Sequence, residues 1–135
     1  MASTSKKPQR RSRKRPVTPR LRLPANVGVA VDAAQDKKAT DVLVLDFRKT
    51  SAFTDAFVIC TGGNLRQVQA IADGVMETLR AKGLKPSLIE GYERGEWVLI
   101  DYFDFIVHVF TPVTREFYSL ERLWADAVHI AVPDN

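Results

Sequence analysis

Cysteine and histidine, which serve as nucleophiles, proton carriers and zinc ligands, are scarce in this chain of 135 residues. Cys60 is its only cysteine, and His108 and His129 are its only histidines. A single cysteine cannot form an internal disulfide, which indicates a reducing compartment. Zinc sites need clustered cysteine and histidine ligands. We therefore expect neither a metal site nor a cofactor.

Long hydrophobic runs are also missing. No apolar stretch approaches the roughly 20 residues that a membrane-spanning helix needs. The first residues are polar and basic, without the apolar core of a secretory signal. The sequence therefore predicts a cytoplasmic protein that has no membrane partner.

Acidic residues are absent from the first 23 residues, which hold nine lysines and arginines. This segment has almost no apolar side chains and cannot offset its ordering entropy, so we predict a disordered basic tail over residues 1–23. Such a tail can bind the phosphate backbone of a nucleic acid. The alternative is an organellar transit peptide, although Pro8, Pro16 and Pro19 would interrupt an amphipathic helix.

The rest of the chain has the opposite charge. Residues 24–135 contain the other 11 lysines and arginines and all 16 acidic residues, a net charge of −5. An acidic body suits a basic protein partner better than a nucleic acid. We predict one folded domain over residues 24–130 and a short C-terminal tail over residues 131–135.

Hydrophobic periodicity predicts the first half of the domain. Apolar residues at helical spacing indicate a short helix over 27–34. Unbroken apolar runs at 42–45 and 57–60 are typical of strands that are buried on both faces. A longer helix follows, with Asn64 as its N-cap and Gly83 as the glycine after its C-terminus.

The second half of the domain predicts three strands and a helix. A short strand at 87–90 precedes a glycine-containing turn at 91–95. Strands at 97–102 and 105–110 form an antiparallel hairpin, and Pro112 begins the last helix. Its predicted apolar stripe comprises Phe117, Leu120, Leu123, Trp124 and Ala127. This order indicates an α/β or α+β domain with a mixed sheet of about five strands.

The reactive side chains have structural interpretations. Cys60 lies in an apolar strand, where its thiol should be inert. His108 shares a strand face with Ile106 and Phe110, which favours a structural histidine that donates one hydrogen bond over a proton carrier. The pair Gly62-Gly63 could cradle a phosphate, but neither a dinucleotide fingerprint nor a P-loop lysine accompanies it. A strand exit that needs positive φ is the alternative.

A nucleotidyltransferase would place two acids on a strand near Gly62-Gly63 to hold Mg²⁺. The nearby acids are Glu90, Asp101 and Asp104, and they form no Asp-x-Asp pair. Asp101 and Asp104 flank the hairpin connection, a position where acidic residues are common because they stabilise turns. We therefore expect a protein that is not an enzyme.

Aromatic residues are concentrated between Trp97 and Tyr118. By alternation, Trp97, Leu99 and Asp101 share one face of their strand, and Tyr102 lies on the other face. A face that carries both a tryptophan and an aspartate suits a half-exposed binding surface. A hairpin core with an exposed aspartate at its end explains the same pattern.

The chain resembles the ribosomal silencing factor (Iojap-like) family from about Val29 to Ala127. The motifs that carry the resemblance in the first half are Asp36-Lys37-Lys38-Ala39-x-Asp41, Ser51-x-Phe53-Thr54-Asp55-x-Phe57-Val58-Ile59-Cys60 and Arg66-Gln67-Val68-x-Ala70-Ile71-Ala72. Those of the second half are Glu90-Gly91, Glu96-Trp97-Val98-Leu99-x-Asp101-Tyr102-x-Asp104, Val107-His108-Val109-Phe110 and Arg115-x-x-Tyr118-x-Leu120-Glu121-x-Leu123-Trp124. Their order and spacing together are specific.

The resemblance implies a nucleotidyltransferase-like fold without working catalytic residues. It also implies a translational repressor that binds large-subunit ribosomal protein fourteen, blocks an intersubunit bridge and prevents association with the small subunit. Free relatives can form homodimers. The partner-binding residues that it implies are Trp97, Asp101, Tyr102, Arg115, Tyr118 and Glu121, whereas Trp124 should point into the core. A nucleotidyltransferase-type enzyme and a general RNA-binding module are the alternative functions.

Overall fold

The computed structural model describes residues 23–50 and 52–134. The predicted disordered tail therefore lies outside the described residues, apart from Leu23. The helices are α2 (Ala25–Asp36), α3 (Leu65–Ala81), α4 (Pro112–Tyr118) and α5 (Leu120–Leu123). The strands are β1 (Thr40–Asp46), β2 (Ala56–Thr61), β3 (Leu88–Glu90), β4 (Trp97–Asp101), β5 (Phe105–Phe110) and β6 (Val128–Ala131).

The strands form one mixed sheet in the order β3-β4-β5-β2-β1-β6. Its centre is the parallel pair β2 and β5, and all other neighbours are antiparallel. Both central strands are buried along their whole length, as continuous apolar runs predict. The mixed sheet and the β4–β5 hairpin are thus confirmed.

The sheet has six strands because β6, which we did not predict, pairs with β1. Three of its four residues are exposed. Val128, His129 and Ile130 do alternate between apolar and polar, but a strand of four residues is too short to be marked by its pattern alone. Ala131 in β6 and the buried Val132 lie beyond residue 130, where we placed the end of the domain.

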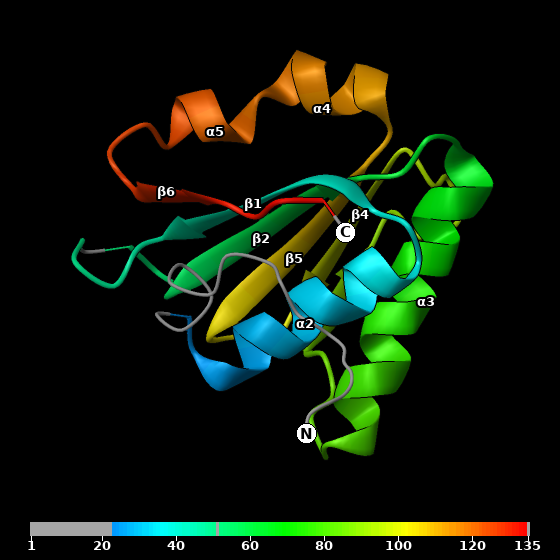
Figure 1. Cartoon of the computed structure of the whole chain (residues 1–135), viewed down its shortest axis with the longest axis horizontal. Coiled ribbons are helices and arrows are strands. Elements are labelled where there is room, and N and C mark those ends of the chain that lie inside the picture. The colour runs from blue at the N-terminus through cyan, green and yellow to red at the C-terminus, as the bar shows by residue number, and fades with distance from the viewer. Residues whose placement is uncertain (1–22, 51, 135) are drawn as a thin grey trace, which may run out of the picture.

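Helices cover the two faces of the sheet unequally (Figure 1). On one face, α2 and α3 pack on the sheet through a large core that includes Val31, Val75 and Val107. On the other face, the smaller core includes Phe57 and Phe110. Among the described residues of α4 and α5, Leu120 is the only buried one.

Both predicted ends of α3 are confirmed. The Asn64 side chain accepts a hydrogen bond from the Gln67 backbone N–H at 2.8 Å. The Gln67 side chain reaches back to the Gly63 N–H at 2.7 Å. At the C-terminus, Gly83 has a φ of +85°, and the Leu84 N–H bonds to the Leu79 carbonyl at 3.0 Å, which closes the helix.

The interpretation of Gly62-Gly63 as a turn that needs positive φ is wrong. The positive-φ glycines of the described chain are Gly83, Gly91 and Gly95. Gly62 is needed for a different reason, because a Cβ atom there would lie 2.9 Å from the Val68 backbone nitrogen. The glycine lets β2 run directly into the first turn of α3.

The prediction of one continuous last helix is also wrong. Ser119 has a left-handed φ of 47° and divides the segment into α4 and α5. This break leaves Phe117 78 % exposed and Leu123 70 % exposed, although both belonged to the predicted apolar stripe. Leu120 and Ala127 are buried as expected, and Trp124 packs at the edge of the second core against Phe47, with 5.3 Å between ring centroids.

Candidate protein-docking surface

Strand β4 has the two-sided character that its sequence predicts. Val98 and Ile100 are buried against the α2–α3 side, whereas Trp97, Leu99 and Asp101 are half-buried on the opposite face. The alternation places a tryptophan and an aspartate on a surface that α4 and α5 cover only in part.

Trp97 is held from three sides. Its ring stacks on Phe110, with 4.9 Å between centroids, and contacts Tyr118 at 4.6 Å. Its indole N–H donates a hydrogen bond to His108 Nδ1 at 3.1 Å. These contacts determine the orientation of the indole and bring Trp97 together with Tyr118, two of the predicted site residues.

His108 has a structural role, but the predicted direction of its hydrogen bond is wrong. Because an indole nitrogen is only a donor, His108 Nδ1 must accept, and the proton of the neutral ring lies on Nε2. Burial lowers the pKa of His108 to about 3, so the ring is neutral at physiological pH. Burial likewise raises the pKa of Cys60 to about 12, which confirms an inert thiol.

Asp101 and Tyr102 lie apart from the Trp97–Tyr118 pair. The Asp101 carboxylate accepts a hydrogen bond from the Phe103 N–H at 2.7 Å, so it supports the hairpin turn, as acids at turns do. Asp101 is four residues from Trp97, a distance of about 13 Å along an extended strand. Tyr102 is buried and belongs to the core on the α2–α3 side.

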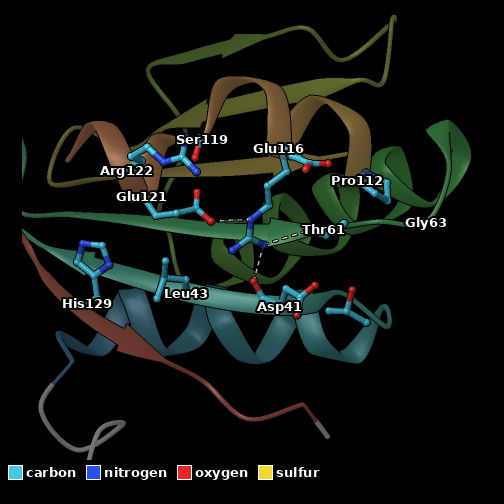
Figure 2. Close-up of a pocket in the computed structure, with 12 residues that line it drawn as sticks. Asp41, Leu43, Thr61, Gly63, Pro112, Glu116, Ser119, Glu121, Arg122 and His129 are labelled. Carbon is cyan, nitrogen blue, oxygen red and sulfur yellow. Dashed lines mark hydrogen bonds and ion pairs between the residues drawn. The ribbon is translucent and has the colours of Figure 1, made fainter. Parts of the chain in front are cut away.

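Arg115 and Glu121 form an ion pair inside a cavity (Figure 2). The Arg115 Nε donates to Glu121 Oε2 at 3.2 Å, and its Nη1 donates to Thr61 Oγ1 at 2.9 Å and to the Asp41 carbonyl. The cavity has a volume of about 730 Å³ and lies between the α4–α5 segment and the adjoining ends of β1 and β2. Arg115 therefore points toward the sheet.

Helices α4 and α5 carry a row of exposed apolar side chains. Phe117 and Leu123 were expected in the core, Tyr118 was predicted to bind the partner, and Val113 was not singled out. This exposed row consists of Val113, Phe117, Tyr118 and Leu123. One signal for it is present in the sequence. Phe117 and Tyr118 are neighbours in a helix, about 100° apart around its axis, and cannot both face the sheet. The exposed row continues the surface around Trp97, because the Tyr118 ring contacts both Trp97 and Phe117.

In residues 23–50 and 52–134, no group of three or more His, Cys, Asp or Glu side chains is placed to hold a metal ion. Over the same ranges, none of the helices has the length and apolar character needed to cross a membrane. The features that this face offers are aromatic contact area and a few oriented charges.

Comparison with known proteins assigns this fold to a family. Residues 21–135 match the family model described as ribosomal silencing factor during starvation. A ribosomal silencing factor of Halalkalibacterium halodurans is 44 % identical over 99 residues, which cover 73 % of this chain and 85 % of that protein. A crystal structure of a Chromobacterium violaceum protein matches with a TM-score of 0.72 at 37 % identity and covers 75 % of this chain and 84 % of that one.

A more distant relative is the mouse protein named mitochondrial assembly of ribosomal large subunit protein 1. It is 28 % identical over 102 residues, which cover 73 % of this chain and 45 % of that protein. By fold, the chain is a mixed-sheet α/β domain like its bacterial structural neighbours. It belongs to the ribosomal silencing factor family, which confirms the resemblance carried by its motifs.

Proposed function

We propose that this chain represses translation by binding the large ribosomal subunit through large-subunit ribosomal protein fourteen. The bound protein sterically blocks an intersubunit bridge and association with the small subunit. The observation that carries the proposal is the exposed row on α4 and α5, which adjoins the immobilised Trp97. The names of the family and of the mouse relative, which refer to ribosome silencing and to large-subunit assembly, support the ribosome as the target.

The composition of this surface favours a protein partner. Exposed aromatic and aliphatic side chains that gather on one face are typical of protein interfaces. The body from residue 24 to residue 135 has a net charge of −5. A negative body and a basic ribosomal protein attract each other, which raises the association rate and disfavours acidic competitors.

The chemistry of the buried groups supports a binding protein over a catalyst. Cys60 cannot form a thiolate near neutral pH, because burial raises its pKa to about 12. His108 cannot accept a proton near neutral pH, because burial lowers its pKa to about 3. Asp101 is engaged in the hairpin turn. None of these three groups suits proton transfer or nucleophilic attack.

The test is cosedimentation with isolated large subunits, combined with a subunit-joining assay. Trp97→Ala removes the aromatic side chain between Phe110 and Tyr118 and should weaken binding by about 2 kcal/mol, because a buried interface tryptophan contributes about that much. Asp101→Arg reverses a charge on the same face of β4 and should also weaken binding. Circular dichroism and thermal unfolding establish that both variants are folded. Undiminished binding by both folded variants would exclude this surface.

A further inference from the structure

The segment formed by α4 and α5, residues 112–124, has its apolar anchoring mainly at its C-terminal end, where Leu120 is buried and Trp124 packs against Phe47. None of the α4 side chains is buried, although the Tyr118 ring contacts Trp97, and Leu120 is the only buried side chain of α5. Helices of seven and four residues are not stable alone in water. Contacts with the sheet must therefore hold this docking segment in place.

Arg115 makes the most widely connected of these contacts. Its guanidinium donates to acceptors on three other elements, namely the Asp41 carbonyl in β1, Thr61 Oγ1 in β2 and Glu121 Oε2 in α5. Its side chain is only 13 % exposed, so these bonds are largely shielded from water. Charged hydrogen bonds of this kind are stronger than bonds between neutral groups.

The backbone of β1 is shaped to meet this guanidinium. The pairing register of β1 with β2 shifts between Thr40 and Leu43, which marks a bulge or irregularity. Asp41 lies within it and has a left-handed φ of 50°. A bulge redirects the groups of its strand, and here the Asp41 carbonyl accepts from Arg115 (Figure 2). The irregular strand and the arginine form one connection, although 74 residues separate them.

We propose that Arg115 is a positioning residue that holds the docking segment against the sheet, so that the exposed row meets the partner already ordered. This inference rests on the proposed docking function for its purpose. A preordered surface binds more tightly because less conformational entropy is lost in the complex. Because its Nε and Nη1 atoms are already engaged and its side chain is only 13 % exposed, Arg115 offers little of its guanidinium to a partner.

The experiment compares Arg115→Ala and Arg115→Lys with Arg122→Ala in the full-length protein. Arg122 is an exposed residue of α5, so its replacement removes the same charge from the same segment without removing these inward bonds. The first measurement is amide hydrogen exchange of the free proteins, with α3, β2 and β5 as internal reference. The second is affinity for isolated large subunits at several salt concentrations.

We expect Arg115→Ala to accelerate exchange over residues 112–124 by about tenfold or more, while α3, β2 and β5 stay protected. Arg115→Lys should fall between Arg115→Ala and the wild type, because one ammonium group cannot reproduce the planar fork. Arg122→Ala should exchange like the wild type. Binding by Arg115→Ala should weaken by about tenfold, with the same salt dependence as Arg122→Ala.

Two results would overturn the inference. Unchanged exchange over residues 112–124 in Arg115→Ala would show that other contacts hold the segment. A flatter salt dependence for Arg115→Ala than for Arg122→Ala would mean that Arg115 itself neutralises a charge on the partner. If the wild-type protein fails to bind large subunits, the proposed function fails, and the exchange measurement on the free protein still decides the role of Arg115.

Discussion

Phe117 offers the sharpest test of where the partner binds. Its side chain is 78 % exposed on the outward side of α4. A phenylalanine that is fully buried removes about 200 Å² from water, so about 150 Å² remains to be covered in a complex. At about 25 cal/mol per Å², this area corresponds to at most about 4 kcal/mol.

The expected loss in Phe117→Ala is smaller than that limit. Ordering of side chains and incomplete burial reduce the gain at an interface, and a strong hot spot typically contributes about 2 kcal/mol. We therefore expect Phe117→Ala to weaken binding to isolated large subunits by about 30-fold. Because the side chain is exposed in the free protein, the free energy of unfolding should change by less than about 0.5 kcal/mol.

Phe103 provides a matched control for this substitution. It is the same residue type, is 77 % exposed and lies in the β4–β5 connection, beyond the end of β4 opposite to Trp97. The assay is cosedimentation or surface-based titration of wild type, Phe117→Ala and Phe103→Ala with the same preparation of large subunits. Equal affinity of Phe117→Ala and the wild type would refute the reasoning, and so would an equal loss in both variants.

Two further predictions concern His108 and the basic tail. Burial lowers the pKa of His108 in the folded protein to about 3, below its usual value of 6.5. Between pH 6.5 and pH 3, the unfolded chain therefore binds a proton at this histidine that the folded protein does not bind. This group stabilises the fold above pH 6.5, and its contribution is lost as the pH falls through this range. The variant His108→Asn retains an acceptor for the Trp97 indole but cannot titrate. Between pH 7 and pH 5, its free energy of unfolding in urea should fall less than that of the wild type. An equal fall in both proteins would exclude this role. Deletion of residues 1–22 should weaken large-subunit binding and flatten its salt dependence, because nine basic charges are lost. Unchanged binding at every salt concentration would exclude a contact between the tail and ribosomal RNA.

Elements with strong local signals could be predicted from the sequence. The ends of α3 are encoded by Asn64 and Gly83, whose cap geometry depends only on neighbouring residues. The central strands β2 and β5 are continuous apolar runs, which need burial on both faces wherever they lie. The two faces of β4 follow from alternation alone, since side chains of a strand point to opposite sides in turn.

Elements that depend on distant partners could not be predicted in this way. β6 is a strand because β1 offers it an open edge, and its own four residues give only a short alternation between apolar and polar side chains. The hydrogen bond of His108 is directed by the position of the Trp97 indole, which only the pairing of β4 with β5 determines. The same holds for Gly62. A glycine is needed there because the Val68 backbone lies too close for a Cβ atom, and not because the turn needs a positive φ.

The sequence by itself determined the family, the mixed α/β sheet and the two-sided strand that carries Trp97, because motifs and periodicity are properties of short stretches of chain. Only the tertiary structure decided which side of the last helical segment faces the solvent. The left-handed residue Ser119 interrupts that segment, and Arg115 directs its charge toward Asp41 and Thr61. An apolar helical stripe is normally buried, but here two of its members, Phe117 and Leu123, are exposed, because contacts from β1 and β2 set the position of the helix.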